Sequence, residues 1–241
     1  MTQISSIPPG GVSVRSPVAA RPVCEPTPRH APTRAAVATT PRCKRAAELL
    51  LVLAAGPLWV PLLGFLMLMV RLDSRGPAVF RQTRVGRGGT PFTLYKLRSM
   101  TVDADDRLGQ HLDACEQRLA EWRQTAKLKR DPRLTRLGRW LRRSSLDELP
   151  QLINVLRGDM SLVGPRPVRD AERVHYGAVF DGYEQVRPGL SGLWQVSGRN
   201  DLSYPQRVAL DRRYLATRSW RNELKIWFRT VGAVLSQRGA Y

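Results

Sequence analysis

One long apolar segment stands out in a chain that is otherwise rich in polar and charged residues. From Leu49 to Val70 the sequence runs for 22 residues without a charged side chain. A helix of that length reaches roughly 33 Å at about 1.5 Å per residue, which is enough to cross the apolar part of a bilayer. A buried core helix is the alternative, but such helices rarely stay apolar on all sides for so long. The pattern therefore favours a membrane-embedded helix.

The middle of this segment contains residues that interrupt a helix. Pro57 and Pro61 lie there, and each proline removes a backbone donor and crowds the preceding turn. Basic residues flank the segment on both sides, so the positive-inside rule gives it no orientation. Both flanks can stay in the cytoplasm if the helix breaks and returns. We expect a re-entrant helix within residues 42–72, broken at Pro57 and Pro61; a proline-kinked spanning helix is the alternative.

The residues before this segment show no apolar periodicity. Residues 1–41 hold eight of the 18 prolines, together with Ser, Thr, Ala and scattered Arg. Proline removes backbone donors, and the segment offers little apolar surface to bury. We expect residues 1–41 to be a disordered tail.

Shorter patterns follow the apolar segment. Two runs rich in β-prone residues flank the turn at residues 87–89, which predicts a hairpin. Residues 103–143 look mainly helical and strongly charged, and the apolar spacing from Leu149 to Leu156 predicts a short helix. The expected fold class is α+β, mainly helical with a small β-hairpin, on a monotopic membrane protein. Residues 73–241 are expected to form one cytoplasmic domain.

Charge adds a partner class to this picture. The 241 residues include 39 Lys+Arg and 20 Asp+Glu, a net charge of +19, and about half of the excess lies in residues 71–146. Such a charge indicates an anionic partner: nucleic acid, anionic lipid or a phosphorylated substrate. The three cysteines are an odd number without metal-ligand spacing, so reduced thiols are expected.

Candidate chemistry begins with the adjacent carboxylates Asp147 and Glu148. Ser145 and Glu148 have the spacing of a capping box, which would make the pair structural. Pro150 argues against that register, because it would fall where a helical donor is needed. A helix that starts at Asp147 instead places Pro150 in the first turn and the carboxylates at the helix N-terminus, where free amides favour anions.

Cations surround this pair along the sequence. Lys96 and Arg98 share one face of the second predicted strand, where they either discourage edge-to-edge aggregation or bind phosphate. Arg166, Arg187 and Arg199 each lie in a turn rich in glycine or proline, and the planar fork of arginine suits phosphate oxygens. Fixed arginines beside paired carboxylates suggest phosphoryl transfer with a divalent metal, since Mg²⁺ takes one or two carboxylates plus substrate phosphates.

In their order along the chain these motifs resemble a known family. The sequence is similar to small, monotopic polyprenyl-phosphate phosphoglycosyl transferases of the bacterial sugar transferase family, of the exopolysaccharide-initiating type. The resemblance covers residues 42–241 and rests on KRAAELLL, RLDSRGPAVFRQTRVG, FTLYKLRSM, LTRLGRWLRRSSLDELPQLINVLRGDMSLVGPRP, VRPGLSGLWQVSGRN and RGAY.

The resemblance implies an enzyme of the bacterial inner (cytoplasmic) membrane with its catalytic domain on the cytoplasmic face. It implies transfer of a sugar-1-phosphate, typically of galactose or glucose, from a UDP-sugar to undecaprenyl phosphate, with release of UMP and a covalent aspartyl-phosphosugar intermediate. Asp147 is then the nucleophile and Glu148 the ligand of a required Mg²⁺. The cations at matching positions are assigned to phosphate or uridine diphosphate binding: Lys96, Arg98, Arg166, Arg187 and Arg199.

Some positions depart from the family pattern or stay open. Glu48 stands where the family has Asp, and the family's Ser-Pro break falls at Val60-Pro61, so its serine is missing. Asp159 and Asp211 also lie in matching motifs, where a structural ion pair is at least as good an interpretation as catalysis. A membrane-tethered basic binding or scaffold protein without catalysis is the alternative function. Nucleic acid is not expected as a partner, because only 7% of residues are aromatic and no recognised nucleic-acid motif is present. The sugar and the oligomeric state are not determined by the sequence.

Overall fold

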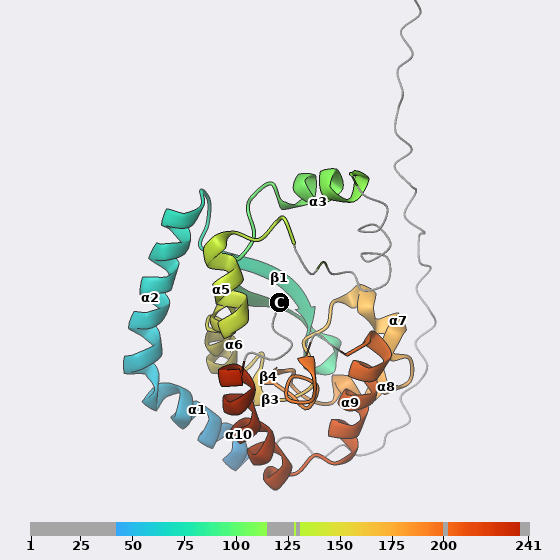
Figure 1. Ribbon diagram of the computed structural model, residues 1–241. Coiled ribbons are helices and arrows are strands. Elements are labelled where there is room, and N and C mark those ends of the chain that lie inside the picture. The colour runs from blue at the N-terminus through green and yellow to red at the C-terminus, as the bar shows by residue number, and fades with distance from the viewer. Residues whose placement is uncertain (1–41, 115–127, 129–130, 200–201, 237–241) are drawn as a thin grey trace, which may run out of the picture. The chain divides into compact units, whose positions relative to one another are not determined.

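The computed structural model describes residues 42–114, 128, 131–199 and 202–236, so the predicted tail of residues 1–41 lies outside this part. Within it the protein is mainly helical and carries two small two-stranded sheets (Figure 1). The predicted mainly helical fold with a β-hairpin is confirmed. The second sheet was not predicted from the sequence.

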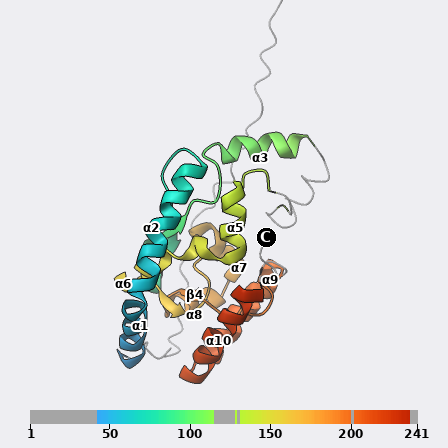
Figure 2. The ribbon, with the colours of Figure 1, turned by 60° about the vertical axis from the view of Figure 1, so that its left-hand side comes forward.

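The apolar segment forms two helices that meet at a bend. Helix α1 (Arg42–Ala54) ends just before Ala55, and α2 (Gly56–Asp73) follows it in a new direction (Figures 1 and 2). Pro57 lies in the first turn of α2, where its missing donor costs little. Pro61 lies inside α2, which continues through it. The break therefore coincides with Pro57 and not with Pro61.

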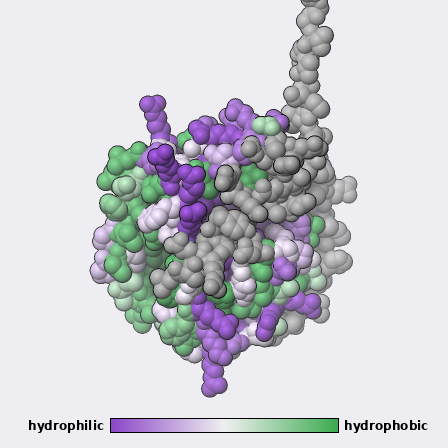
Figure 3. Space-filling model, viewed as in Figure 1, coloured by the Kyte–Doolittle hydropathy of each residue, from purple (hydrophilic) through white to green (hydrophobic). Residues whose placement is uncertain are grey.

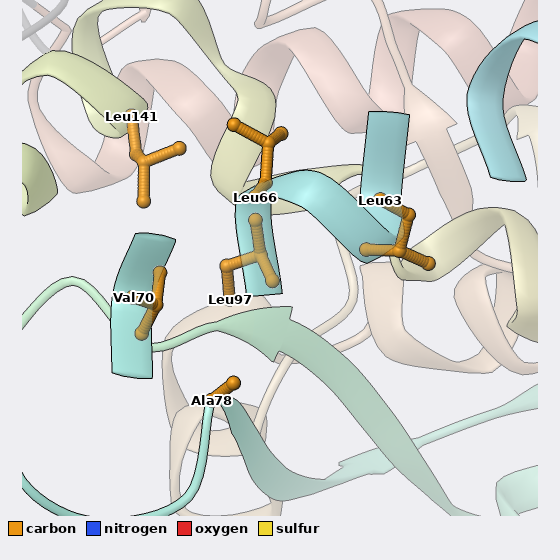
Figure 4. Packing of buried hydrophobic residues seen from close by; sticks show 6 residues of the cluster. All are labelled: Leu63, Leu66, Val70, Ala78, Leu97 and Leu141. Carbon is orange, nitrogen blue, oxygen red and sulfur yellow. The ribbon is translucent and has the colours of Figure 1, made fainter. Parts of the chain in front are cut away.

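One side of α2 packs on the rest of the protein. Leu63, Leu66 and Val70 are buried against residues of the hairpin and of α5 (Figure 4). The remaining surface of α2 is exposed and apolar, and includes Leu58, which is 76% exposed, and Phe65. Hydrophobic residues cover the side of the molecule on which α2 lies (Figure 3). Among the described helices, α2 alone is long and apolar enough to cross a membrane, and only 17% of its apolar window is buried.

The predicted hairpin lies beside these helices. Strands β1 (Val79–Val85) and β2 (Pro91–Leu97) pair antiparallel, with Phe80 opposite Lys96. The turn between them is the short helix η1 (Arg87–Gly89), in which Gly88 and Gly89 have φ of 69° and 73°. Only glycine takes such backbone angles without steric cost, which explains the paired glycines of the turn.

Two helices of the predicted helical region 103–143 fall within the described residues. These are α3 (Ala104–Asp113) and α5 (Arg136–Ser144). The N-terminus of α5 is capped by Thr135, whose hydroxyl accepts from the Gly138 amide. A Cβ at Gly138 would lie 1.9 Å from the Ser99 carbonyl oxygen, so glycine allows α5 to approach the end of β2.

The C-terminal half surrounds a parallel pair of very short strands, β3 (Ser161–Val163) and β4 (Gly189–Ser191). A Cβ on Gly189 would meet the Gly164 amide nitrogen at 2.1 Å, so the two loops touch only because both residues are glycine. Short helices complete this half: α6 (Gln151–Arg157), η3 (Asp170–Glu172), α7 (Arg173–Tyr176), α8 (Val179–Glu184), α9 (Tyr204–Ala216) and α10 (Trp220–Ser236).

Buried charges attach α1 to this half. The Lys44 ammonium lies 2.7 Å from a Glu223 carboxylate oxygen of α10, and both residues are buried. Glu48 accepts hydrogen bonds from the Ser161 hydroxyl and, at 3.1 Å, from the Leu162 amide at β3. The acidic residue at position 48 therefore serves to dock α1 on β3.

Candidate active site

The carboxylate pair lies in a tight turn between α5 and α6. Asp147 and Glu148 belong to the short helix η2 (Leu146–Glu148), and α6 begins only after Pro150. The helix was predicted to start at Asp147, but a 3₁₀ turn lies there and the α-helix starts at Gln151. Ser145 has a left-handed backbone, with φ of 58°, and its side chain forms no cap. The capping-box interpretation of Ser145 and Glu148 is thus wrong.

Lys96 connects β2 to this turn. Its ammonium lies 2.6 Å from Glu148 Oε1 and donates a hydrogen bond to it. The lysine and glutamate side chains remain 29% and 34% exposed. The structure thus brings Lys96 to the carboxylate pair, as the sequence predicted for a cation of the site.

The two carboxyl groups differ in their environments. Burial, with the negative charge of Glu148, raises the pKa of Asp147, although Lys96 and Arg142 oppose this. Burial also acts to raise the pKa of Glu148, but the charge and hydrogen bond of Lys96, together with the charges of Arg166 and Arg199, lower it overall. Asp147 is buried with 8% of its surface exposed. The turn therefore holds one poorly solvated, less acidic carboxyl beside one that is firmly ionised.

Two of the predicted arginines act on the same carboxylate from other loops. The positive charges of Arg166 and Arg199 contribute, after Lys96, to the lowered pKa of Glu148. The Arg166 guanidinium lies 5.1 Å from the ring centre of Trp194. Arg199 has a left-handed backbone with φ of 50°, as a tight turn requires. Lys96, Arg166 and Arg199 thus converge on Glu148 from three distant parts of the chain.

Arg142 is a site residue that the sequence analysis did not single out within the strongly charged residues 103–143. It lies on the last turn of α5, and its charge lowers the pKa of Asp147. Its Nε donates to the Ser99 hydroxyl at 2.9 Å, which orients the guanidinium. Its position five residues before Asp147 could have suggested a place near the carboxylates. The sequence did not distinguish it, because several other arginines lie in the same helix.

The structure does not bring Arg98 and Arg187 to the carboxylate pair. Arg98 donates to the carbonyl oxygens of Ser74 and Arg75 at 2.6 and 2.8 Å, where it closes the end of α2. Arg187 donates to the Gly158 carbonyl at 2.7 Å, at the end of α6 opposite to Glu148. Both side chains hold backbone in these places, and their phosphate-binding role stays a prediction.

Neither Asp159 nor Asp211 forms a salt bridge within the described residues. Asp159 accepts a hydrogen bond from the Asn154 amide at 3.0 Å. Asp211 is fully buried and accepts from the Tyr176 hydroxyl at 2.7 Å and from the Arg166 backbone amide at 3.4 Å. Asp211 therefore fixes the loop that carries Arg166, and the predicted ion pairs are not found.

This arrangement suits a phosphate substrate with a divalent cation. No cluster of three or more His, Cys, Asp or Glu side chains that could hold a metal occurs among the described residues. The adjacent carboxylates Asp147 and Glu148 would therefore supply at most two protein ligands of the kind that a metal prefers. Mg²⁺ accepts such a set, because it is commonly held by one or two carboxylates plus substrate phosphates.

A family model described as bacterial sugar transferase matches residues 39–237. This match spans most of the chain and includes the whole candidate site. The chain belongs to the bacterial sugar transferase family. The resemblance seen in the sequence is thereby confirmed.

Relatives in the bacterial sugar transferase family carry names that describe sugar transfer to a lipid carrier. A UDP-galactose-lipid carrier transferase of Erwinia amylovora is 47% identical over 198 residues, which are 82% of this chain and 41% of that protein. An undecaprenyl-phosphate galactose phosphotransferase of Salmonella typhimurium is 47% identical over 181 residues, 75% of this chain and 38% of that protein. The chain thus spans about two fifths of the length of these relatives. The exopolysaccharide production protein ExoY of Rhizobium meliloti is 42% identical over 198 residues, 82% of this chain and 88% of that protein.

Proposed function

We propose that this bacterial sugar transferase moves a sugar-1-phosphate from a UDP-sugar to undecaprenyl phosphate and releases UMP. The observation that carries the proposal is the buried Asp147 beside the ionised Glu148, with Lys96, Arg142, Arg166 and Arg199 acting on the pair. A single nucleophilic carboxylate among fixed cations is suited to accept a phosphoryl group and pass it on.

The reaction has two steps that use the same carboxylate. In the first, a carboxylate oxygen of Asp147 bonds to the sugar-linked phosphorus, and the bond from that phosphorus to the bridging oxygen breaks, so UMP leaves. In the second, a phosphate oxygen of undecaprenyl phosphate attacks the same phosphorus and frees Asp147. Covalent catalysis of this kind divides one difficult transfer into two easier ones.

The surrounding residues have separate tasks in this proposal. Burial deprives Asp147 of water, and Arg142 favours its ionised form. Lys96, Arg166 and Arg199 bind the negative charge of the diphosphate. Glu148 would hold Mg²⁺, which would supply positive charge to neutralise the phosphates.

A covalent adduct on Asp147 provides the direct test. Purified protein is incubated with UDP-galactose or UDP-glucose and Mg²⁺ without lipid, and its intact mass is measured. We expect a gain equal to one hexose phosphate, which disappears when undecaprenyl phosphate is added. Asp147→Asn should show no gain, whereas Asp181→Asn, an exposed carboxylate of α8, should behave like the wild type. An adduct of normal yield on Asp147→Asn would remove Asp147 as nucleophile.

The same assay identifies the sugar. Relatives are named for galactose or for glucose, the latter including a UDP-glucose:undecaprenyl-phosphate glucose-1-phosphate transferase of Caulobacter vibrioides. We infer that one of these two is the natural sugar and that the product starts an exopolysaccharide. The donor that gives the faster adduct formation decides between them.

Membrane attachment is the second part of the proposal. The exposed apolar surface of α2 and the bend at Ala55 support a re-entrant anchor, with the catalytic domain at the cytoplasmic face of the inner membrane. Cysteine substitutions at Leu58, near the bend, and at Leu72, near the end of α2, distinguish the topologies. The background for both variants has the native cysteines Cys24, Cys43 and Cys115 replaced by serine. In a re-entrant helix a membrane-impermeant thiol reagent added outside labels neither variant. Labelling at Leu58→Cys from outside would indicate a spanning helix.

A membrane-tethered basic scaffold remains the second candidate function. It predicts lipid binding that falls steeply with salt and does not depend on Asp147. Absence of any adduct with all UDP-sugars would favour this alternative.

A further inference from the structure

Lys96 lies on the carboxylate that a divalent cation would need. Its ammonium contacts Glu148 Oε1 at 2.6 Å, and both side chains are about one third exposed. An ammonium and Mg²⁺ cannot both sit against one carboxylate oxygen without strong repulsion. The flexible four-carbon stem and the partial exposure of Lys96 allow the ammonium to move aside.

Two other cations of the site, Arg142 and Arg166, have contacts that restrain them. Arg142 is bound to the Ser99 hydroxyl, and Arg166 is fixed through its backbone amide by Asp211. The guanidinium of Arg166 also lies 5.1 Å from the ring centre of Trp194, and that of Arg207 lies 5.3 Å from the same ring. Lys96, by contrast, makes an ion pair with Glu148 itself, so it is the cation whose movement would free this carboxylate for a metal.

We propose that Lys96 acts as an internal counter-ion of Glu148 that moves to the diphosphate when the nucleotide binds, so that the nucleotide and the divalent cation bind cooperatively. The inference rests on the proposed function, because it takes a nucleoside diphosphate as substrate. It assigns Lys96 a positioning role in addition to phosphate binding. Without nucleotide, the lysine keeps Glu148 neutralised and lowers its affinity for the metal.

This exchange has a thermodynamic consequence that can be measured. If phosphate binding draws Lys96 away from Glu148, the nucleotide raises the affinity for the cation, and the cation raises the affinity for the nucleotide by the same factor. A lysine that only binds phosphate would leave the affinity for the cation alone unchanged when it is replaced.

The first measurement uses Mn²⁺ alone as the probe. Free and bound Mn²⁺ are separated by electron paramagnetic resonance in titrations of the full-length protein without nucleotide. Lys96→Met keeps the stem and removes the charge, and we expect it to bind Mn²⁺ about tenfold more tightly than the wild type. Lys225→Met, which removes one exposed charge on α10, is the matched control and should bind Mn²⁺ like the wild type.

The second measurement adds UMP, a monophosphate that chelates metals weakly. UMP should raise the Mn²⁺ affinity of the wild type several-fold and change that of Lys96→Met much less. Equal Mn²⁺ affinities of the wild type and Lys96→Met would overturn the proposal. Lack of coupling to UMP in the wild type would overturn it as well, even if Lys96→Met failed to fold.

The outcome is separable from the proposed function. The covalent adduct on Asp147 is measured by mass and does not depend on whether Lys96 and the cation compete. Mn²⁺ binding that is the same in Glu148→Gln and the wild type would show that the cation does not use Glu148. That result would overturn the exchange and the metal assignment while leaving the adduct test intact.

Discussion

Arg142 is one of the side chains that affect the protonation of Asp147, the proposed nucleophile. Its charge is one of the two that oppose the effect of burial on the pKa of Asp147. Replacing it by glutamine should raise that pKa further and leave less of the ionised carboxylate. We expect Arg142→Gln to slow adduct formation about 10- to 100-fold, with a larger loss at pH 6 than at pH 8.

A neighbour on the same helix is the control for this prediction. Arg139 is exposed on α5. Replacing it by glutamine removes the same charge from the helix without removing Arg142. Arg139→Gln should form the adduct at the wild-type rate. An equal loss in both variants would mean that the total charge of α5 matters and not the electrostatic effect of Arg142 on Asp147.

The raised pKa of Asp211 implies that the free energy of unfolding depends on pH in the direction opposite to that of an ordinary carboxylate. Burial raises its pKa to about 7, so the folded protein keeps a proton that the unfolded chain releases near pH 4. The folded state therefore loses stability relative to the unfolded state as pH rises from about 4 to about 7, by up to roughly 1.4 kcal/mol per pH unit.

Asp211→Asn removes this titration while keeping the size of the side chain. Its free energy of unfolding relative to the wild type should improve between pH 4.5 and pH 7.5. Urea unfolding in detergent, followed by tryptophan fluorescence, measures this difference. A difference that stays constant over this range would show that Asp211 is ionised throughout.

At the scale of elements, the close approach of α5 to β2 positions Arg142. Gly138 lies against the Ser99 carbonyl, and the hydroxyl of the same serine accepts from Arg142. Gly138→Ala would force the two elements apart, because its Cβ would meet backbone that cannot rotate away. We expect a loss of about 1 to 3 kcal/mol in the free energy of unfolding, together with slower adduct formation.

Gly109 provides the matched control on α3, since a Cβ there meets nothing within 4 Å. Gly109→Ala should leave the adduct unchanged and stabilise the protein by up to about 1 kcal/mol, because alanine favours the helix. Thermal unfolding measures the stability of both variants, and the mass assay measures their rates of adduct formation. Equal behaviour of the two would contradict the steric explanation.

At the scale of the whole molecule, a buried ion pair joins the first described helix to the last. Lys44 of α1 and Glu223 of α10 are 179 positions apart in sequence and 2.7 Å apart in space. Removing one partner leaves the other charge buried, which typically costs about 3 to 5 kcal/mol. Lys44→Met should therefore destabilise the protein strongly, and adding Glu223→Leu should restore much of the loss.

A double-mutant cycle measures this coupling. The exposed pair Asp103 and Arg107 on α3 serves for comparison, because exposed ion pairs contribute at most about 1 kcal/mol. We expect the coupling energy between Lys44 and Glu223 to exceed that of the exposed pair clearly. Equal coupling energies would mean that α1 is not held by this contact.

The sequence by itself determined the kinds of elements and the kind of chemistry. Apolar spacing and paired glycines predicted the break-prone apolar segment and the hairpin, because these depend on neighbouring residues. The linear motif around Asp147 and Glu148 was sufficient to indicate the family. Lys96, on one face of a predicted strand, and Arg166, in a turn rich in glycine and proline, were predicted as cations of the site because these are local features of the sequence.

Only the tertiary structure decided which cations meet the carboxylates. Arg98 and Arg187 have the same chemistry as Arg166, but packing directs them to the ends of α2 and α6. The sequence did not distinguish Arg142 from the other arginines of α5. Its place at the site depends on the close packing of α5 against the end of β2, which Gly138 allows. The parallel strands β3 and β4 were missed because they are three residues long and pair across 25 intervening residues. Contacts between distant parts of a chain depend on packing in three dimensions, which the periodicity of a sequence does not encode.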